Sequence, residues 1–328
     1  GRSQETVLWQ VADAFLDAAA AGARIRVQEE NLRAQDELLD RVEAFYNSGK
    51  RPVADLYQQQ AERASAEYDL ISATHTSELL KLNLLEIMDL PPDTLITLST
   101  ESAAGIIRQR LPIPESVADS MAAAAENRTD VLAARANLRA ADASIRAARS
   151  GYWPTVSLNT EAGTSYSSSM TASFNDQIGS DNPYASLGVS ISLPLMDRHA
   201  TRNAVAVAEL QERRLALAIR DIEDQVISDI RRAFLEYQTA EEQRASAEKK
   251  VIYARQALES FEQRYVVNAA TLLEVIQARA VLLSAQYDTI SAETNLLKKH
   301  VALAYSQGTL GNIIAGEDAR KGEPLVKQ

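Results

Sequence analysis

The spacing of apolar side chains predicts long helices over much of the chain. Five apolar residues recur at intervals of three and four: Val251, Ala254, Leu258, Phe261 and Tyr265. This spacing places them along one stripe of a helix, as in the seam of a coiled coil. A second stripe follows, and between the two lies 266–271, where β-branched residues and Asn weaken a helix. Because Thr271 and Glu274 then form a capping signal, we predict an antiparallel helical hairpin with its tip near 266–271.

Glycine and proline mark where these helices end. Neither residue occurs between Pro194 and Gly308, so 195–307 is one unbroken run. Such a run is much longer than a globular helix and is typical of a coiled coil or a helical repeat. The breakers gather instead at 91–114 and 151–194.

An internal repeat appears when the chain is shifted by 219 positions against itself. Tyr46 then meets Tyr265, and the segment 68–73 meets 287–292 with Tyr, Asp, Ile, Ser and Ala in matching places. The predicted hairpin therefore occurs twice. Its first tip covers 47–52, where Gly49 is able to turn and Pro52 is suited to open the returning helix.

Two short segments between the hairpins alternate apolar and polar residues, which is the pattern of a β-strand with two different faces. They lie at 155–162 and 187–193, joined by a polar segment, 164–183, that we predict to be an exposed loop. Strands of this kind fit a transmembrane barrel. They also fit a hairpin that covers a soluble core, and the pattern alone leaves both interpretations open.

Composition narrows the function classes. The absence of Cys excludes disulfides and thiol catalysis. A net charge of −11 disfavours binding to nucleic acid, which needs a basic face. The chain contains no run of about 18 apolar residues, so the sequence predicts no transmembrane helix. The three histidines form no metal-ligand pair, and no acid or base stands beside a nucleophile, so we expect neither an enzyme nor a cofactor.

Several motifs resemble those of the TolC-like outer-membrane efflux protein family, the outer membrane factors. Tyr46-x-x-Gly49 followed by Asp55, and Tyr265-x-x-Asn268 followed by Glu274, resemble the family's two hairpin tips. The segments 151–154 and 186–195 resemble its strand entry and exit, and 306–310 resembles its closing segment. Their order around a tandem repeat makes the resemblance specific over nearly all of 5–312.

The resemblance implies a mainly α fold: long antiparallel coiled-coil hairpins in tandem, with one β-hairpin of a transmembrane barrel. It implies a homotrimer in the Gram-negative outer membrane, with helices extending into the periplasm. Such a protein is a passive export duct of a tripartite efflux or type I secretion system, in which a periplasmic adaptor and an inner-membrane pump are the partners. The expected divisions are 5–90 first hairpin, 91–114 linker, 115–150 helix, 151–195 β-hairpin, 196–307 second long helices and hairpin, and 308–328 tail.

The resemblance also implies three sets of site residues. Glu274 and Gln277 stand where the family constricts its pore, although Glu274 has the alternative role of capping its helix. Membrane-interface contacts are expected at Tyr152, Trp153 and Tyr184, for which packing at a strand end is the alternative. Contacts with the adaptor are expected at exposed tip residues: Tyr46, Gly49, Lys50, Arg51, Asp55, Tyr265, Asn268 and Ala269.

Two other protein classes use long helical hairpins, a periplasmic adaptor and a soluble coiled-coil scaffold. An adaptor has one hairpin within a β-rich body, which disfavours it for a chain with two. In a scaffold, 152–195 would be a cap. The helix and strands that precede the second hairpin have no counterpart before the first, so we expect a further segment, with a first strand pair, upstream of Gly1.

Overall fold

The computed structural model describes residues 2–96, 98, 100–114, 116–181 and 183–311, which form two compact units. The first unit combines the chain up to Leu132 with the chain from Glu223 onward. The second unit is Ala133–Ile222. Within the described residues, no helix is both long enough and apolar enough to cross a membrane.

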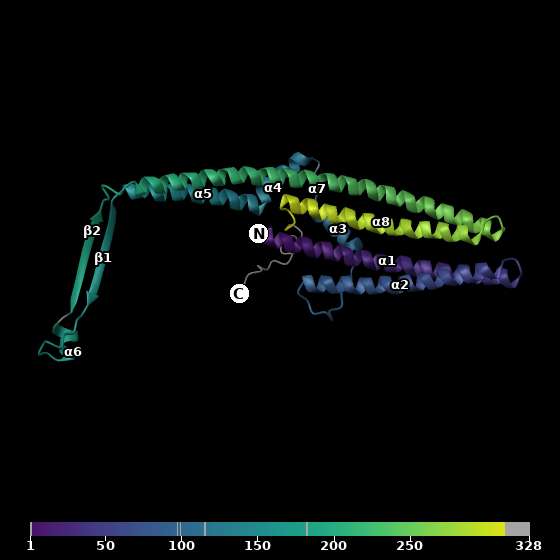
Figure 1. Ribbon diagram of the computed structural model, residues 1–328, viewed down its shortest axis with the longest axis horizontal. Helices are drawn as coiled ribbons and strands as arrows, with labels where there is room; N and C mark the ends of the chain where they lie inside the picture. The colour runs from purple at the N-terminus through teal and green to yellow at the C-terminus, as the bar shows by residue number, and fades with distance from the viewer. Residues whose placement is uncertain (1, 97, 99, 115, 182, 312–328) are drawn as a thin grey trace. The chain divides into compact units, whose positions relative to one another are not determined.

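The first unit contains the two predicted hairpins (Figure 1). One consists of α1 (Arg2–Asn47) and α2 (Val53–Ile87), and the other of the C-terminal part of α7 (Ala200–Val266) and α8 (Leu272–Gln307). The ends of α1 and α7 are 219 positions apart, and so are the starts of α2 and α8. The tandem repeat is therefore confirmed at the predicted offset.

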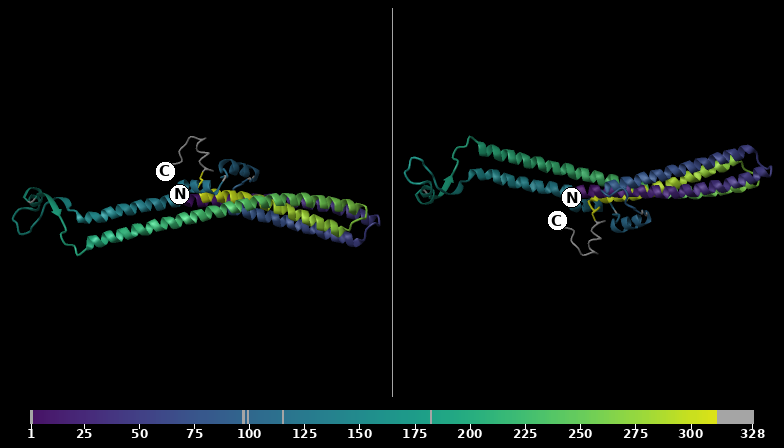
Figure 2. Two further views of the ribbon diagram at one scale, coloured as in Figure 1. Left: turned by 90° about the horizontal axis from the view of Figure 1, so that it is seen from above. Right: turned by 90° about the horizontal axis from the view of Figure 1, so that it is seen from below.

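The two tips share one apolar core. Leu38 and Val42 of α1 are buried together with Leu258 and Tyr265 of α7 and Val275 of α8. Figures 1 and 2 both show the two tips at the same end of this unit. The 3-4 stripes of both hairpins thus meet in a common seam, as the predicted coiled-coil spacing requires.

The segment expected to be a linker, 91–114, contains a helix, α3 (Thr100–Arg110). Ile107 and Leu111 are buried against α8, which gives this short helix its apolar support. His300 of α8 lies with Nε2 2.7 Å from the Leu111 carbonyl oxygen, so Nε2 donates its proton there. Burial lowers the pKa of His300, which keeps the ring neutral in this contact.

The expected single helix over 115–150 is two helices, α4 (Val117–Asn127) and α5 (Thr129–Arg149). They separate at Arg128, whose backbone is extended. The Arg128 guanidinium donates to Asp130 at 2.7 Å and to the Ser306 carbonyl at 3.3 Å. No Gly or Pro marks this break, because its cause is a contact with the end of α8.

The second unit carries an antiparallel hairpin of β1 (Thr155–Gly163) and β2 (Tyr184–Ser192). Thr155 pairs with Ser192 at one end, and Gly163 pairs with Tyr184 at the other. Val156, Leu158, Val189 and Ile191 lie on one face and are exposed, while Ser, Thr, Asn and Glu occupy the other face.

The connection between the two strands is not a plain loop. It carries a helical turn, α6 (Phe174–Asp176), followed by a π-helical turn, η2 (Gln177–Asp181). Before β1, a 3₁₀ turn, η1 (Ser150–Tyr152), follows α5. Of the expected tail 308–328, residues 312–328 lie outside the described residues.

Candidate functional site at the paired hairpin tips

Both tips turn through the same hydrogen bonds. The Gly49 N–H donates to the Tyr46 carbonyl at 2.9 Å, and the Asn268 N–H donates to the Tyr265 carbonyl at 3.1 Å. In each tip the following N–H reaches the carbonyl five residues back, which completes a Schellman motif. Gly49 has a φ of 72° and Asn268 has a φ of 60°, so Asn takes the left-handed conformation that Gly takes in the first tip.

Arg51 joins the first tip to the second. Its Nη2 donates to the Tyr265 carbonyl at 3.2 Å and to the Ala270 carbonyl at 3.1 Å. Its guanidinium lies 4.3 Å from the centroid of the Tyr265 ring, and Asp55 approaches it to 4.0 Å. Arg51 is thus a cross-link between the hairpins, and its Nη2 donors are used inside the chain.

Tyr265 was expected among the exposed tip residues, and that expectation is wrong. Its side chain is 2% exposed and lies edge-on to Phe45, with 5.9 Å between the ring centroids. Burial raises the pKa of its hydroxyl. The position belongs to the tip core because Arg51 and the α1 stripe cover the ring from the first hairpin.

The remaining tip residues form an exposed end surface. Four of them, together with the neighbouring Val267, make up what we call the tip surface: Tyr46, Gly49, Lys50, Asn268 and Val267. Lys50 is exposed, and its ammonium lies 5.9 Å from the Phe45 ring centroid. Ala269 is exposed beside them, and Asp55 is half-buried and faces Arg51. The expected contact set therefore divides into an exposed part and a part that holds the tips together.

Glu274 caps α8, as the alternative interpretation expected. The Thr271 N–H and hydroxyl both donate to its Oε2, at 2.7 Å and 2.9 Å, and the Glu274 N–H donates back to Thr271 Oγ1 at 3.3 Å. These hydrogen bonds lower the pKa of Glu274, so the carboxylate is ionised at neutral pH. Gln277, one turn further along, is exposed. The capping hydrogen bonds hold the charged Glu274 carboxylate at the start of α8.

The three expected membrane-interface residues lie at opposite ends of the β-hairpin. Tyr152 and Trp153 are exposed just before β1. Tyr184 lies at the other end, where its hydroxyl donates to Glu161 at 2.9 Å. Its ring covers Gly163, at which an added Cβ would lie 2.8 Å from the tyrosine oxygen. Tyr184 thus packs at a strand end on the polar face, as the alternative interpretation expected, while the interface role stays a prediction.

A model of the family described as "Outer membrane efflux protein" matches residues 121–309, more than half of the chain. The chain belongs to this family. The resemblance found in the tip and strand motifs is thereby confirmed. Proteins of the outer membrane efflux family are channel proteins and not enzymes, and they lie in the Gram-negative outer membrane with helices in the periplasm.

Named relatives of the efflux family cover most of this chain. The pyoverdine export outer membrane protein OpmQ of Pseudomonas putida KT2440 is 29% identical over 304 residues, which are 92% of this chain and 62% of that protein. Outer membrane protein TolC of Escherichia coli K12 is 24% identical over 317 residues, 94% of this chain and 62% of that protein. The chain thus spans about three fifths of the length of these relatives.

Solved structures of efflux channels share the fold. A CusC structure aligns with a TM-score of 0.76 at 18% identity, over 94% of this chain and 69% of that one. The outer membrane protein VceC from Vibrio cholerae aligns with a TM-score of 0.70 at 21% identity, over 93% of this chain and 70% of that one. The predicted class, helical hairpins with one β-hairpin, is therefore confirmed.

The sequence indicated neither the burial of Tyr265 nor that Arg51, grouped with Lys50 as a partner contact, joins the two tips. The tandem repeat carries no signal for the role of Arg51, because Arg51 and Lys50 both have Ala as their counterpart at the offset of 219. The two cations are told apart only by the contacts that Arg51 makes with the second tip. Within the described residues, no group of His, Asp and Glu is arranged to hold a metal ion.

Proposed function

We propose that this chain is part of one protomer of a passive export duct, assembled as a homotrimer and docked by its tips to a periplasmic adaptor. An inner-membrane pump would supply the energy for efflux or type I secretion. One observation carries this proposal: two hairpins with the same backbone geometry are held with their tips together by Arg51. The two tips, held together, form one rigid surface with exposed polar residues, which is what a docking partner needs.

The β-hairpin supports the lipid-facing part of the proposal. Each strand has nine residues, close to the 9 to 11 that a tilted strand needs to span a bilayer. Its exposed apolar face would meet lipid, and its Ser, Thr and Glu face would meet the water of the duct. Tyr152 and Trp153 would then lie at the headgroup level.

The pore end of the duct is assigned to Glu274. In a trimer each pore residue occurs three times, so three Glu274 carboxylates would form a ring of like charge. Gln277 would add amides instead of a second set of charges. The capping hydrogen bonds from Thr271 would hold each carboxylate in place.

Docking is tested at Lys50, because Arg51 is already engaged with the second tip. We expect Lys50→Glu to weaken binding of the periplasmic adaptor to the natural protein by about tenfold, since it reverses a charge on the tip surface. The matched control is Lys249→Glu, another exposed lysine, located 17 positions before the second tip. Equal affinity of both variants, measured by surface plasmon resonance, would remove the tip surface from the proposal.

A further inference from the structure

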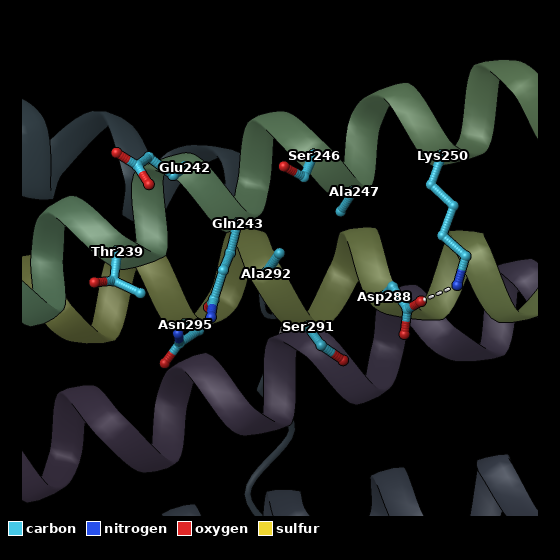
Figure 3. A pocket seen from close by; sticks show the side chains of 10 residues that line it. All are labelled: Thr239, Glu242, Gln243, Ser246, Ala247, Lys250, Asp288, Ser291, Ala292 and Asn295. Carbon is cyan, nitrogen blue, oxygen red and sulfur yellow. Dashed lines mark hydrogen bonds and ion pairs between the residues drawn. The ribbon is translucent and has the colours of Figure 1, made fainter.

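The internal repeat relates two grooves, one in each hairpin. The first groove lies between α1 and α2, and its lining includes Arg24, Gln28, Asp69, Ser72, Ala73 and Thr76. The second groove lies between α7 and α8, and its lining includes the counterparts of these residues at the offset of 219: Gln243, Ala247, Asp288, Ser291, Ala292 and Asn295. Figure 3 shows these second-groove side chains together with Lys250, which pairs with Asp288.

The first groove is covered by a side chain from the other hairpin. Tyr287 of α8 lines it. The Arg24 guanidinium lies 5.9 Å from the centroid of the Tyr287 ring, and Gln28 lines the groove together with them. Arg24 also donates to Ser291 at 3.0 Å, which holds α8 along this groove. An aromatic residue of the second repeat thus closes the groove of the first.

The second groove has no such cover. In the part of the chain that the structure describes, all the residues that line it belong to α7 and α8 themselves. Its volume is about 670 Å³, which leaves room for an aromatic side chain. Ala247 is the counterpart of the larger Gln28, which lines the first groove together with Tyr287. The second groove is therefore deeper at this position.

The counterpart of Tyr287 is Tyr68 of α2, and it is 72% exposed. Ile71, the counterpart of the half-buried Ile290, is 65% exposed. Tyr57 lies eleven positions before Tyr68, and Leu82 lies eleven after Ile71; both are exposed too. Eleven positions make three helical turns, so these four side chains lie along one face of α2, on which His75 is also exposed. Large exposed apolar side chains gathered on one face mark a contact surface.

We propose that Tyr68 of a second copy of this chain closes the second groove, as Tyr287 closes the first. This inference rests on the proposed homotrimer and names the surface through which its copies meet. The rotation that superposes the first hairpin on the second would also superpose α8 on α2 of the next copy. Because one surface meets a different surface of its neighbour, the contact is head to tail, and three copies close into a ring if each is rotated by about 120° from the next. In it, the Tyr68 ring would lie over Ala247 and beside Lys250, which replaces Arg24 as the neighbouring cation.

Cysteine pairs test this contact, because the chain contains no cysteine. The test pair is Tyr68→Cys with Ala247→Cys. The matched control is Gln28→Cys with Tyr287→Cys, the same two positions of the repeat exchanged between the hairpins. Both pairs are introduced into the natural protein in detergent and treated with a short bismaleimide cross-linker. Single-cysteine variants give the background, and light scattering gives the size of the assembly before cross-linking.

We expect the test pair to shift most chains to covalent dimers and trimers on a denaturing gel. We expect the control pair to consume both thiols at the mass of one chain, because that contact lies within a chain. If light scattering shows trimers and the control pair reacts, but the test pair stays at the mass of one chain, the interface is wrong while the proposed trimer stands. A protein that is monomeric before cross-linking would contradict the proposed trimer and this interface together.

Discussion

The two hairpins share one backbone design but differ in their buried polar residues. In the first hairpin, Gln59 is fully buried and donates to Gln35 at 2.7 Å. The corresponding positions of the second hairpin are Ala254 and Ala278, both buried. The second hairpin instead buries Arg279, which pairs with Glu262.

This contrast distinguishes the residues that determine the shared backbone of the hairpins from the residues that differ between the two hairpins. Helix ends and tips coincide at an offset of 219 although the polar pairs do not, so the apolar spacing and the left-handed tip residue are enough to set the backbone. A buried polar pair has a partner in only one alignment of two helices. We infer that each hairpin carries its own pair to fix its own register.

Removing the buried arginine should give the largest effect. We expect Arg279→Ala to lower the free energy of unfolding by about 3 kcal/mol, because it leaves Glu262 without its partner in a mostly buried site. Gln60, the counterpart in the first hairpin, is exposed, and Gln60→Ala should change stability by less than about 0.5 kcal/mol. Urea unfolding followed by helical circular dichroism measures both. Equal losses would mean that the two hairpins do not differ in the way described.

The ends of the two returning helices offer the next contrast. Gly308 has a φ of 73°, and its counterpart Asp89 has a φ of 54°; both use the same pair of hydrogen bonds. A Cβ at Gly308 would lie 2.9 Å from the Arg128 backbone nitrogen. We therefore expect Gly308→Ala to cost about 2 kcal/mol, from strain and from this contact.

The matched variant is Asp89→Ala, at a position that already has a Cβ in the left-handed conformation. We expect it to change stability by less than about 1 kcal/mol. Thermal unfolding of the two variants separates these values. A loss at Gly308 no larger than that at Asp89 would show that the contact with the α4–α5 break is unimportant.

Exchanging the tip residues should have smaller effects of opposite sign. Gly49 has open space around an added methyl group, so Gly49→Ala should cost only the left-handed strain, about 1 kcal/mol. Asn268→Gly should stabilise by about 0.5 kcal/mol, because it relieves the same strain in the second tip. Chemical denaturation measures both. A gain at Gly49→Ala would contradict the shared tip geometry.

The smallest effect concerns pH and the cap of α8. The pKa of Glu274 is lowered by its hydrogen bonds with Thr271, so its stabilising contribution is present above the unfolded-state pKa of about 4.3. It is lost as the pH falls through the lower, folded-state pKa. We expect Glu274→Gln to lower the melting temperature slightly at pH 7 and to leave it unchanged in stronger acid. The same difference at both pH values would argue against an ionised cap.

Much of this fold follows from the sequence because its elements are long and repeated. The tip predicted at 266–271 lies between Val266 and Leu272, and the absence of Gly and Pro over 195–307 predicted α7 and α8. The α4–α5 break was missed because it depends on Arg128 reaching the end of α8. The roles of Arg51 and Tyr265 were missed for the same reason, since each is fixed by a contact between hairpins that lie far apart in the sequence. In contrast, the sequence was sufficient to place Tyr184 on the polar face of the β-hairpin, because the side chains of a strand alternate between its two faces.

The central claim, that this chain forms part of an export duct, is tested most directly by the conductance of the natural protein in planar lipid bilayers. We predict discrete open-channel steps, and a weaker preference for cations when Glu274→Gln removes the proposed ring of charge. A correctly folded protein that produces no channels would contradict the account.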